Sequence, residues 1–405
     1  MLEEKSMGTT NRRGFLKSVA VGGTAAGAGL AATGLFPRRI YSQGASKFNR
    51  VRYRELGSTG CKVTEMGFGV MNNREADLVH AAIDSGINYI DTAHYYMKGE
   101  NEKIVGSVMK TKRDKVFLTT KVGLRDKTPE SIRKEIDLSL KRLQTDRVDL
   151  LLFHKSDKRE EILNDDTMKV FDDARKKGQT RFVGFSTHNF EPEPFDAGID
   201  SKFWEAILTG YNYFSPPSLT KSIQKTREAG IAIIGMKNLI TMTWPPDTRV
   251  PYEDIRKDKS TKTTPQQALL KWVLDDNYVD TIIPGMTTFE HLNDNLAVMG
   301  MKLTLDDRRI IRRYCEGVKS TYCRGVAGCT ECREKCPKGV KVCDINRCLG
   351  YAYGYKDLDL AYENYQALPK SNRVDICADC DECAVKCVNG LNLTENIRKA
   401  RELFA

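Results

Sequence analysis

The chain has 405 residues, of which 40% are hydrophobic and 29% are charged. This composition is ordinary for a globular protein, and it excludes a multi-span membrane protein and a largely disordered chain. The net charge is +10, but no long run of Lys and Arg with interleaved aromatic residues occurs, so we predict no nucleic-acid partner. The length predicts two or three domains, or one large barrel with a small module.

Residues 1–45 have the anatomy of an export signal, because a basic segment precedes a Gly- and Ala-rich apolar stretch at 18–36 and a polar exit. The pair Arg12–Arg13 resembles a twin-arginine signal, although Asn11 stands where Ser or Thr is usual. A membrane-spanning helix is the alternative, which the length allows and the glycines disfavour. We therefore predict the twin-arginine export machinery as a partner. The expected location is periplasmic, or anchored to the outer face of the inner membrane.

From residue 50 onward, short apolar runs alternate with amphipathic stretches such as Pro129–Leu143. Eight runs are candidate strands: Glu65–Met71, Asn88–Asp91, Val116–Lys121, Val148–Phe153, Phe182–Ser186, Ala206–Tyr211, Ile231–Met236 and Thr281–Pro284. Eight strand–helix repeats predict an α/β fold, a (β/α)8 TIM barrel over residues 46–316. The rival, a doubly wound sheet, would favour a G-x-G-x-x-G turn after the first strand, and the sequence has none there.

Reactive side chains stand at the ends of three successive predicted strands. Asp91 ends the second strand and is followed by Tyr96, Lys121 ends the third, and His154 follows the fourth. The carboxyl ends of barrel strands share one rim, so these side chains are expected to converge. The set suits carbonyl reduction. Hydride addition to a carbonyl leaves an alkoxide, which the phenol of Tyr96 can protonate when an ammonium such as that of Lys121 lies beside it. The carboxylate of Asp91 would orient the ammonium, and the imidazole of His154 could hold the carbonyl oxygen.

The chain resembles the aldo-keto reductase family from about residue 52 to about residue 310. The resemblance rests on four features: Leu56-Gly57-x-Thr59-Gly60-x-x-Val63 with Gly67-x-Gly69, Asp91-Thr92-Ala93-x-x-Tyr96, Lys121 after a hydrophobic strand, and Arg142-Leu143-x-x-Asp146-x-Val148-Asp149-Leu150-x-x-x-His154. It implies Tyr96 as acid/base, Lys121 and Asp91 as its tuning pair, and His154 as the group that orients the substrate. Met97 departs from the family, which usually has Gly after the tyrosine.

The resemblance also implies a nicotinamide cofactor across the rim. The expected contacts are Gly69, Ser186, Asn189, Met236, Lys237, Gly285 and Asn295. NAD and NADP both stay open, because the positions that often carry a cation for the 2′-phosphate look like Gly285 and His291. His94 and His188 are interpreted as lining or structural residues. The polar loop 243–263 is either a cap over the substrate or a surface loop.

Ten of the twelve cysteines lie between Cys323 and Cys387. The run Cys377-x2-Cys380-x2-Cys383-x3-Cys387 has the bacterial ferredoxin spacing, in which the fourth cysteine serves the other cluster. We therefore predict a ferredoxin-like, mainly helical domain at 317–405 that holds one or two [4Fe-4S] clusters. One site takes Cys336, Cys377, Cys380 and Cys383. The other takes Cys329, Cys332, Cys387 and Cys323, with Cys343 or Cys348 as replacements for Cys323.

Structural zinc in paired C-x2-C sites is the alternative for these cysteines, but the x2-x2-x3 run supplies a surplus of ligands. Between the two cysteine runs, Ile345–Leu368 is predicted to be a tyrosine-rich helix that packs on the barrel or the clusters.

The sequence thus predicts an NAD(P)-dependent oxidoreductase that interconverts a small-molecule carbonyl and an alcohol. The clusters would carry electrons or stabilise the structure, and a redox partner protein is a further candidate. The alternative is a non-catalytic barrel that acts as a redox-linked binding module, with the clusters as electron carriers for a partner.

Overall fold

The computed structural model describes residues 51–240, 263–332 and 334–404. The predicted export signal at 1–45 and nearly all of the loop 243–263 lie outside the described residues, so both stay predictions.

Eight parallel strands form the barrel, in the sheet order β10-β9-β8-β7-β6-β5-β4-β3. They are β3 (Phe68–Gly69), β4 (Tyr89–Asp91), β5 (Phe117–Val122), β6 (Val148–Phe153), β7 (Thr180–Thr187), β8 (Ala206–Gly210), β9 (Ala232–Met236) and β10 (Thr281–Ile282). Parallel bridges Met66–Ile282 and Gly69–Gly285 join the first strand to the last and close the barrel. Each strand falls within or beside a predicted one, and the barrel is confirmed.

A hairpin that the sequence did not predict as strands precedes the barrel. It consists of β1 (Tyr53–Glu55) and β2 (Lys62–Thr64), which pair antiparallel. Leu56 and Val63 are fully buried and belong to the cluster of apolar side chains that fills the barrel interior. Ser58 N donates to Gly230 O at 2.8 Å, just before β9, so the hairpin closes the barrel at the amino ends of the strands.

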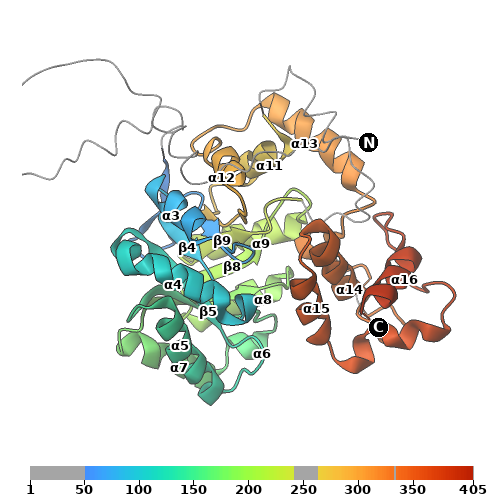
Figure 1. The fold of residues 1–405 in the computed structure, drawn as a ribbon, viewed down its shortest axis with the longest axis horizontal. Coiled ribbons are helices and arrows are strands. Elements are labelled where there is room, and N and C mark those ends of the chain that lie inside the picture. Colours follow the sequence, from blue (N-terminus) through green and yellow to red (C-terminus); the bar gives the residue numbers. More distant parts are fainter. Residues whose placement is uncertain (1–50, 241–262, 333, 405) are drawn as a thin grey trace, which may run out of the picture.

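Helices surround the strands (Figure 1). They are α3 (Ala76–Asp84), α4 (Glu100–Lys112), α5 (Pro129–Leu143), α6 (Arg159–Ile162), α7 (Asp165–Lys176), α8 (Pro192–Ser201), α9 (Pro217–Glu228), α11 (Pro265–Leu274), α12 (Phe289–Leu296) and α13 (Leu305–Val318). Helix α5 has the predicted bounds. The Thr128 side chain accepts from Ser131 N at its start, and Gln144 in the left-handed conformation ends it.

The C-terminal segment is helical in its described residues and lies at one side of the barrel (Figure 1). It contains α14 (Val342–Leu349), the π-helical turn η5 (Gly350–Gly354), α15 (Leu358–Gln366) and α16 (Leu393–Phe404). The prediction of one helix over Ile345–Leu368 is wrong. Lys356 takes a positive φ of 55°, and Asp357 caps a new helix by accepting from Leu360 N.

The C-terminal segment shares an apolar core with the barrel. Helix α13 runs across the predicted domain boundary at residue 316. Ile240 and Leu269 lie in one apolar cluster with Leu349 on α14, and Asn212 Nδ2 donates to Tyr322 Oη at 3.3 Å. The two parts are therefore held by apolar packing and by a buried hydrogen bond. No helix within residues 51–240, 263–332 and 334–404 has the length and apolar character needed to cross a membrane.

Candidate active site

The side chains at the ends of β4 and β5 meet at a buried ion pair. Lys121 Nζ lies 2.6 Å from Asp91 Oδ1 and donates to Thr92 O at 2.7 Å. Both side chains of the pair are almost completely buried. Lys121 Nζ also lies 3.2 Å from Tyr96 Oη. The structure thus brings together three of the four residues predicted from strand ends.

The two partners of the pair respond differently to burial. Burial raises the pKa of Asp91 above its ordinary value, and the ammonium of Lys121 opposes this rise. Burial disfavours the ammonium of Lys121, but Asp91 and Tyr96 outweigh burial and raise its pKa above the ordinary value. Asp91 therefore holds Lys121 in place and favours its ammonium form.

The pKa of Tyr96 differs from the sequence-based expectation. Burial raises it above the ordinary value of a phenol, while Lys121 opposes this rise. The ammonium lowers the pKa as expected, but burial has the larger effect in the protein alone. Tyr96 is therefore a neutral phenol at neutral pH, which is the form that can donate a proton.

His154 completes the predicted set. Its ring lies 6.1 Å from the Tyr96 ring, centroid to centroid, in an edge-on arrangement. The side chain is 7% exposed, and Nδ1 is buried without a hydrogen-bond partner in the described residues. Burial, followed by the charges of Lys121 and Lys155, holds its pKa well below the usual range. The imidazole is therefore neutral, and it can donate one hydrogen bond to a carbonyl oxygen.

The loop after Tyr96 is strained. Met97 and Lys98 have φ of 51° and 55°, in the left-handed region that glycine adopts without cost. This explains physically why glycine suits the position that Met97 occupies. Asn101 Nδ2 lies 3.9 Å from Met97 Sδ, and Lys98 Nζ lies 3.4 Å from Glu363 on α15. The loop that carries the tyrosine therefore touches the C-terminal segment.

The residues predicted to contact the cofactor have different surroundings. A Cβ on Gly69 would lie 2.6 Å from Ile283 O, so barrel closure alone explains this glycine. Ser186 Oγ accepts from Lys155 N at 2.9 Å, and Asn189 Nδ2 donates to Asp157 O at 2.9 Å. Both side chains thus hold the loop after β6. Their cofactor contacts stay predictions, as do those of Met236 and Gly285.

Two predicted cofactor residues fit a polar ligand more directly. Lys237 Nζ and Asn295 Nδ2 are buried and have no hydrogen-bond partner among the described residues. A buried donor without a partner costs free energy, which a bound ligand would recover. These two atoms, with His154 Nδ1, are therefore consistent with a cofactor at the carboxyl edge.

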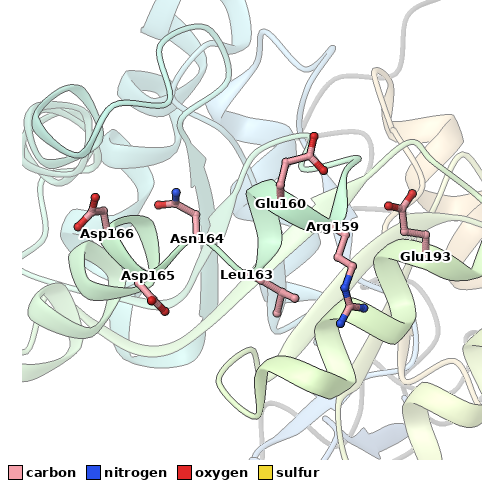
Figure 2. A pocket seen from close by; sticks show the side chains of 7 residues that line it. All are labelled: Arg159, Glu160, Leu163, Asn164, Asp165, Asp166 and Glu193. Atoms are coloured by element: carbon pink, nitrogen blue, oxygen red, sulfur yellow. The ribbon is translucent and has the colours of Figure 1, made fainter.

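A separate surface hollow of about 840 Å³ lies between α6, α7 and α8. Figure 2 shows its lining residues: Arg159, Glu160, Leu163, Asn164, Asp165, Asp166 and Glu193. None of the predicted catalytic or cofactor residues is among them. We assign this hollow no role in the chemistry.

The cysteines gather in two groups. Cys377 interacts electrostatically with Cys380, Cys383 and Cys336. The second group lines a hollow and contains Cys323, Cys329, Cys332, Cys343 and Cys387. Each group draws on both cysteine runs, in the exchange that the ferredoxin spacing predicts. Cys343, which the sequence analysis held only as a replacement, hydrogen-bonds to both Cys323 and Cys332.

Within the described residues, no three Cys, His, Asp or Glu side chains are placed to hold a single metal ion. Thiolates around one zinc, with bonds of about 2.3 Å, would lie only ~3.8 Å apart. An iron–sulfur cluster is larger than one ion and holds its ligands farther apart. All twelve cysteines are free of disulfides.

The C-terminal segment adds residues to the site that the sequence analysis missed. Tyr351 and Tyr355, both in or next to η5, interact electrostatically with Tyr96. Tyr351 also interacts with Arg347 on α14. The sequence analysis predicted only that the tyrosine-rich stretch packs on the barrel or on the clusters. Nothing in the local sequence indicated which tyrosine faces the catalytic one.

Residues 65–240 match the model of the aldo/keto reductase family. The matched segment contains Asp91, Tyr96, Lys121 and His154. The uncharacterized oxidoreductase YqkF of Bacillus subtilis is 33% identical over 152 residues, which cover 34% of this chain and 49% of that protein. The chain thus spans about half the length of this relative. The methylglyoxal reductase DkgB of Escherichia coli O157:H7 is 27% identical over 58% of this chain and 85% of that protein.

Solved structures share the fold. The holo form of the aldo-keto reductase AKR11C1 from Bacillus halodurans has a TM-score of 0.55 and 24% identity, covering 65% of this chain and 96% of that one. An aldo-keto reductase from Klebsiella pneumoniae in complex with NADPH has a TM-score of 0.53 and 24% identity, covering 64% and 95%. The family match and the reductases among the relatives support the predicted class, an aldo-keto reductase-like NAD(P)-dependent oxidoreductase.

Proposed function

We propose that the protein interconverts a carbonyl compound and an alcohol, with Tyr96 as the acid/base. The observation that carries the proposal is the hydrogen bond between Lys121 Nζ and Tyr96 Oη, at 3.2 Å. The same ammonium is paired with Asp91. The methylglyoxal reductase among the relatives supports a small carbonyl as the substrate.

The chain's own residues would share the work as follows. His154 donates a hydrogen bond to the carbonyl oxygen and holds it near Tyr96. Tyr96 passes its hydroxyl proton to that oxygen when the carbonyl carbon is reduced, and the Lys121 ammonium stabilises the phenolate that remains. A proton from solvent then restores the phenol. A bound nicotinamide supplies the hydride, so that carbonyl, NAD(P)H and one proton give alcohol and NAD(P)⁺.

Two buried donors at the carboxyl edge support nicotinamide binding, Lys237 Nζ and Asn295 Nδ2. We propose NADP or NAD as the cofactor. The relative solved with NADPH favours NADP.

Replacement of Tyr96 by Phe tests the reaction. We expect the rate of carbonyl reduction to fall by about 10²–10⁴-fold, the range that general acid catalysis contributes. Binding of NADPH or NADH, measured by nucleotide fluorescence, should change little. Tyr95→Phe is the matched control, since Tyr95 Oη donates to Glu135 and lies outside the catalytic set.

Equal rates for Tyr96→Phe and the wild type would refute the assigned role. A wild-type protein that converts no aldehyde, ketone, sugar or alcohol in a broad screen would favour the alternative of a redox-linked binding module.

We further propose that the two cysteine groups each bind a [4Fe-4S] cluster. The grouping of Cys336 with Cys377, Cys380 and Cys383 supports the first site. Cys329, Cys332 and Cys387 around the second hollow support the other. The clusters would carry electrons to a partner protein or stabilise the docked C-terminal segment.

Export by the twin-arginine route, to the periplasm or the outer face of the inner membrane, is part of the proposal. It rests on Arg12–Arg13 and on the chemistry of the clusters. That route transports folded proteins, which suits a protein whose clusters are inserted before export.

A further inference from the structure

The loop that follows Tyr96 has an unfavourable backbone. Met97, Lys98 and Gly99 take φ of 51°, 55° and 94° in succession, in the left-handed region that side chains disfavour. Non-glycine residues keep such a conformation only where the surrounding structure holds them in it. The contacts around this loop therefore determine where Tyr96 lies.

On the barrel side, the buried side chain of Asn101 connects this loop to the neighbouring one. Asn101 Oδ1 accepts from Thr92 Oγ1 at 2.7 Å. Its Nδ2 donates to Val70 O at 2.7 Å and to Asn73 O at 3.2 Å. The loop after β4, which carries Tyr96, is thus joined to the loop after β3, and the two loops form one unit.

Both loops are also paired with α15 in the C-terminal segment. Lys98 Nζ lies 3.4 Å from Glu363 Oε1, and Arg74 Nη2 in the loop after β3 lies 3.9 Å from Asp357 Oδ2. Asp357 is the capping residue of α15, since it accepts from Leu360 N at 2.9 Å. One helix thus contacts both loops through two carboxylates.

The two ion pairs are partly open to solvent. Lys98 and Arg74 are exposed, whereas Glu363 and Asp357 are half-buried. Exposed pairs contribute little stability when their partners must first be ordered. These pairs can therefore hold the loops only if α15 itself is fixed by other contacts.

Such contacts lie on the opposite side of the barrel. Strands β7 and β8 face β3 and β4 across the closed ring. Gly328 packs so closely on the loops after β7 and β8 that a Cβ there would lie 3.1 Å from Phe190 Cβ and 2.9 Å from Pro216 Cδ. The ring of Tyr322 stacks on Phe214 with centroids 5.6 Å apart. The C-terminal segment is thus anchored to the barrel far from the Tyr96 loop.

An apolar cluster connects this anchor to α15. Tyr322, Leu349 on α14, and Ala361 and Tyr365 on α15 are all buried in it. Helix α15 is therefore fixed from the far side of the barrel and reaches across to the two loops. Because the helix is already ordered, its carboxylates meet Arg74 and Lys98 without the cost of ordering a free segment.

We propose that Asp357 and Glu363 are positioning residues that hold the loop of Tyr96 in its catalytic geometry. They act through Arg74 and Lys98 and not on the substrate. The inference rests on the proposed role of Tyr96 as the acid/base, and it makes the C-terminal segment a requirement for full activity.

Exchange of the charges in one pair tests the contact. Lys98→Glu and Glu363→Lys should each lower the single-turnover rate of carbonyl reduction by about two- to fivefold, the range for one exposed ion pair. The variant with both changes should recover at least half of the wild-type rate, because the pair forms again in reverse. The assay uses saturating nucleotide and the compound that the wild type reduces fastest.

Glu402→Lys on α16 is the matched control, because it makes the same change of charge in the same segment. Glu402 pairs with Lys399 of its own helix at 3.2 Å, so this variant should keep the wild-type rate. Wild-type rates in both single variants of the Lys98 pair, or losses that multiply when the two changes are combined, would overturn the proposal.

The second pair needs a milder change, because Asp357 also caps α15. Asp357→Asn keeps a capping side chain and removes the charge. Combined with Glu363→Gln, it should lower the single-turnover rate by about 4- to 25-fold if the two pairs act independently. Binding of NADPH or NADH should not change, which separates misplacement of Tyr96 from a general loss of folded protein. Equal losses of rate and of nucleotide binding would count against a positioning role.

Hydrogen exchange reports on the loop without turnover. The backbone N of Tyr96 donates to Ala93 O at 3.1 Å, and that of Lys98 donates to Tyr95 O at 3.2 Å. In the Asp357→Asn/Glu363→Gln variant both amides should exchange faster, because the loop opens more often, and Glu402→Lys should exchange as the wild type does. Unchanged exchange would overturn the proposal. Faster exchange in a protein that reduces no carbonyl compound would support the role of α15 and refute only the proposed reaction.

Discussion

Asn389 Nδ2 donates to Cys329 Sγ at 3.5 Å, although 60 residues separate the two in the chain. The backbone N of Asn389 also donates to Cys387 Sγ at 3.4 Å. One residue thus orients a sulfur from each of the two cysteine runs. This contact joins the two cysteine runs around the second cysteine group. The fourth ligand of the proposed cluster there is Cys323, Cys343 or Cys348.

We predict that Cys343, and not Cys323, is that fourth ligand. Cys332 interacts first with Cys343 and then with Cys329 and Cys387. Cys343→Ala should therefore lower the iron and acid-labile sulfide of anaerobically purified protein by about four atoms each, the content of one [4Fe-4S] cluster. Cys323→Ala should leave both contents unchanged.

Cys61→Ala, outside the cysteine-rich segment, is the control for this experiment. If Cys323→Ala alone lowers the iron and sulfide contents, Cys323 is the fourth ligand, as the spacing of the cysteines predicts. Zinc without sulfide in the wild type would exclude iron–sulfur clusters altogether.

The buried histidine His94 predicts a loss of stability in mild acid. Burial, followed by the charge of Arg142, lowers its pKa to about 4, and its Nδ1 lies 2.9 Å from Ser139 Oγ. Between pH ~6.5 and ~4 the unfolded chain binds a proton that the folded chain does not. The free energy of unfolding should therefore fall as pH decreases through this window, and the contribution of His94 should be complete above pH ~6.5.

Urea denaturation at pH 7.5, 6 and 5 measures this effect. His94→Gln should reduce the pH slope of the unfolding free energy by about 1.4 kcal/mol per pH unit inside the window, the value for one proton. An unaltered slope in His94→Gln would show that the imidazole is protonated in the folded protein.

Conversion of Arg12 and Arg13 to lysines tests the export proposal. The paired arginines are the feature that the twin-arginine receptor reads, so the variant should stay in the cytoplasm. Arg38 and Arg39 form a second pair in the same segment and provide the matched control, because their conversion to lysines should leave export unchanged. Cell fractionation with immunoblotting measures both, and export of the Arg12/Arg13 variant would refute the twin-arginine assignment.

The barrel and the ion pair could be predicted because both follow from local patterns. Alternation of apolar runs and amphipathic stretches defined eight strands, and barrel topology then placed Asp91 and Lys121 on one rim, where their atoms lie 2.6 Å apart. The two cysteine groups likewise follow from spacing, because residues two or three apart on a tight turn face the same side.

Contacts made by docking could not be predicted in the same way. Whether Tyr351 comes near Tyr96 depends on how the C-terminal segment packs on the barrel, which no periodicity in the sequence encodes. The break after η5 was missed because the tyrosine-rich stretch keeps a helical pattern on both sides of Lys356. Burial also outweighed the expected effect of Lys121 on the pKa of Tyr96, and burial is a property of the tertiary structure.

The shared core of the barrel and the C-terminal segment has a consequence for biosynthesis. The strands of the barrel are complete at Ile282, but Arg347 and Tyr351 leave the ribosome much later. A nascent chain would thus carry the Asp91–Lys121 pair for some time without the helical segment that places Tyr351 near Tyr96.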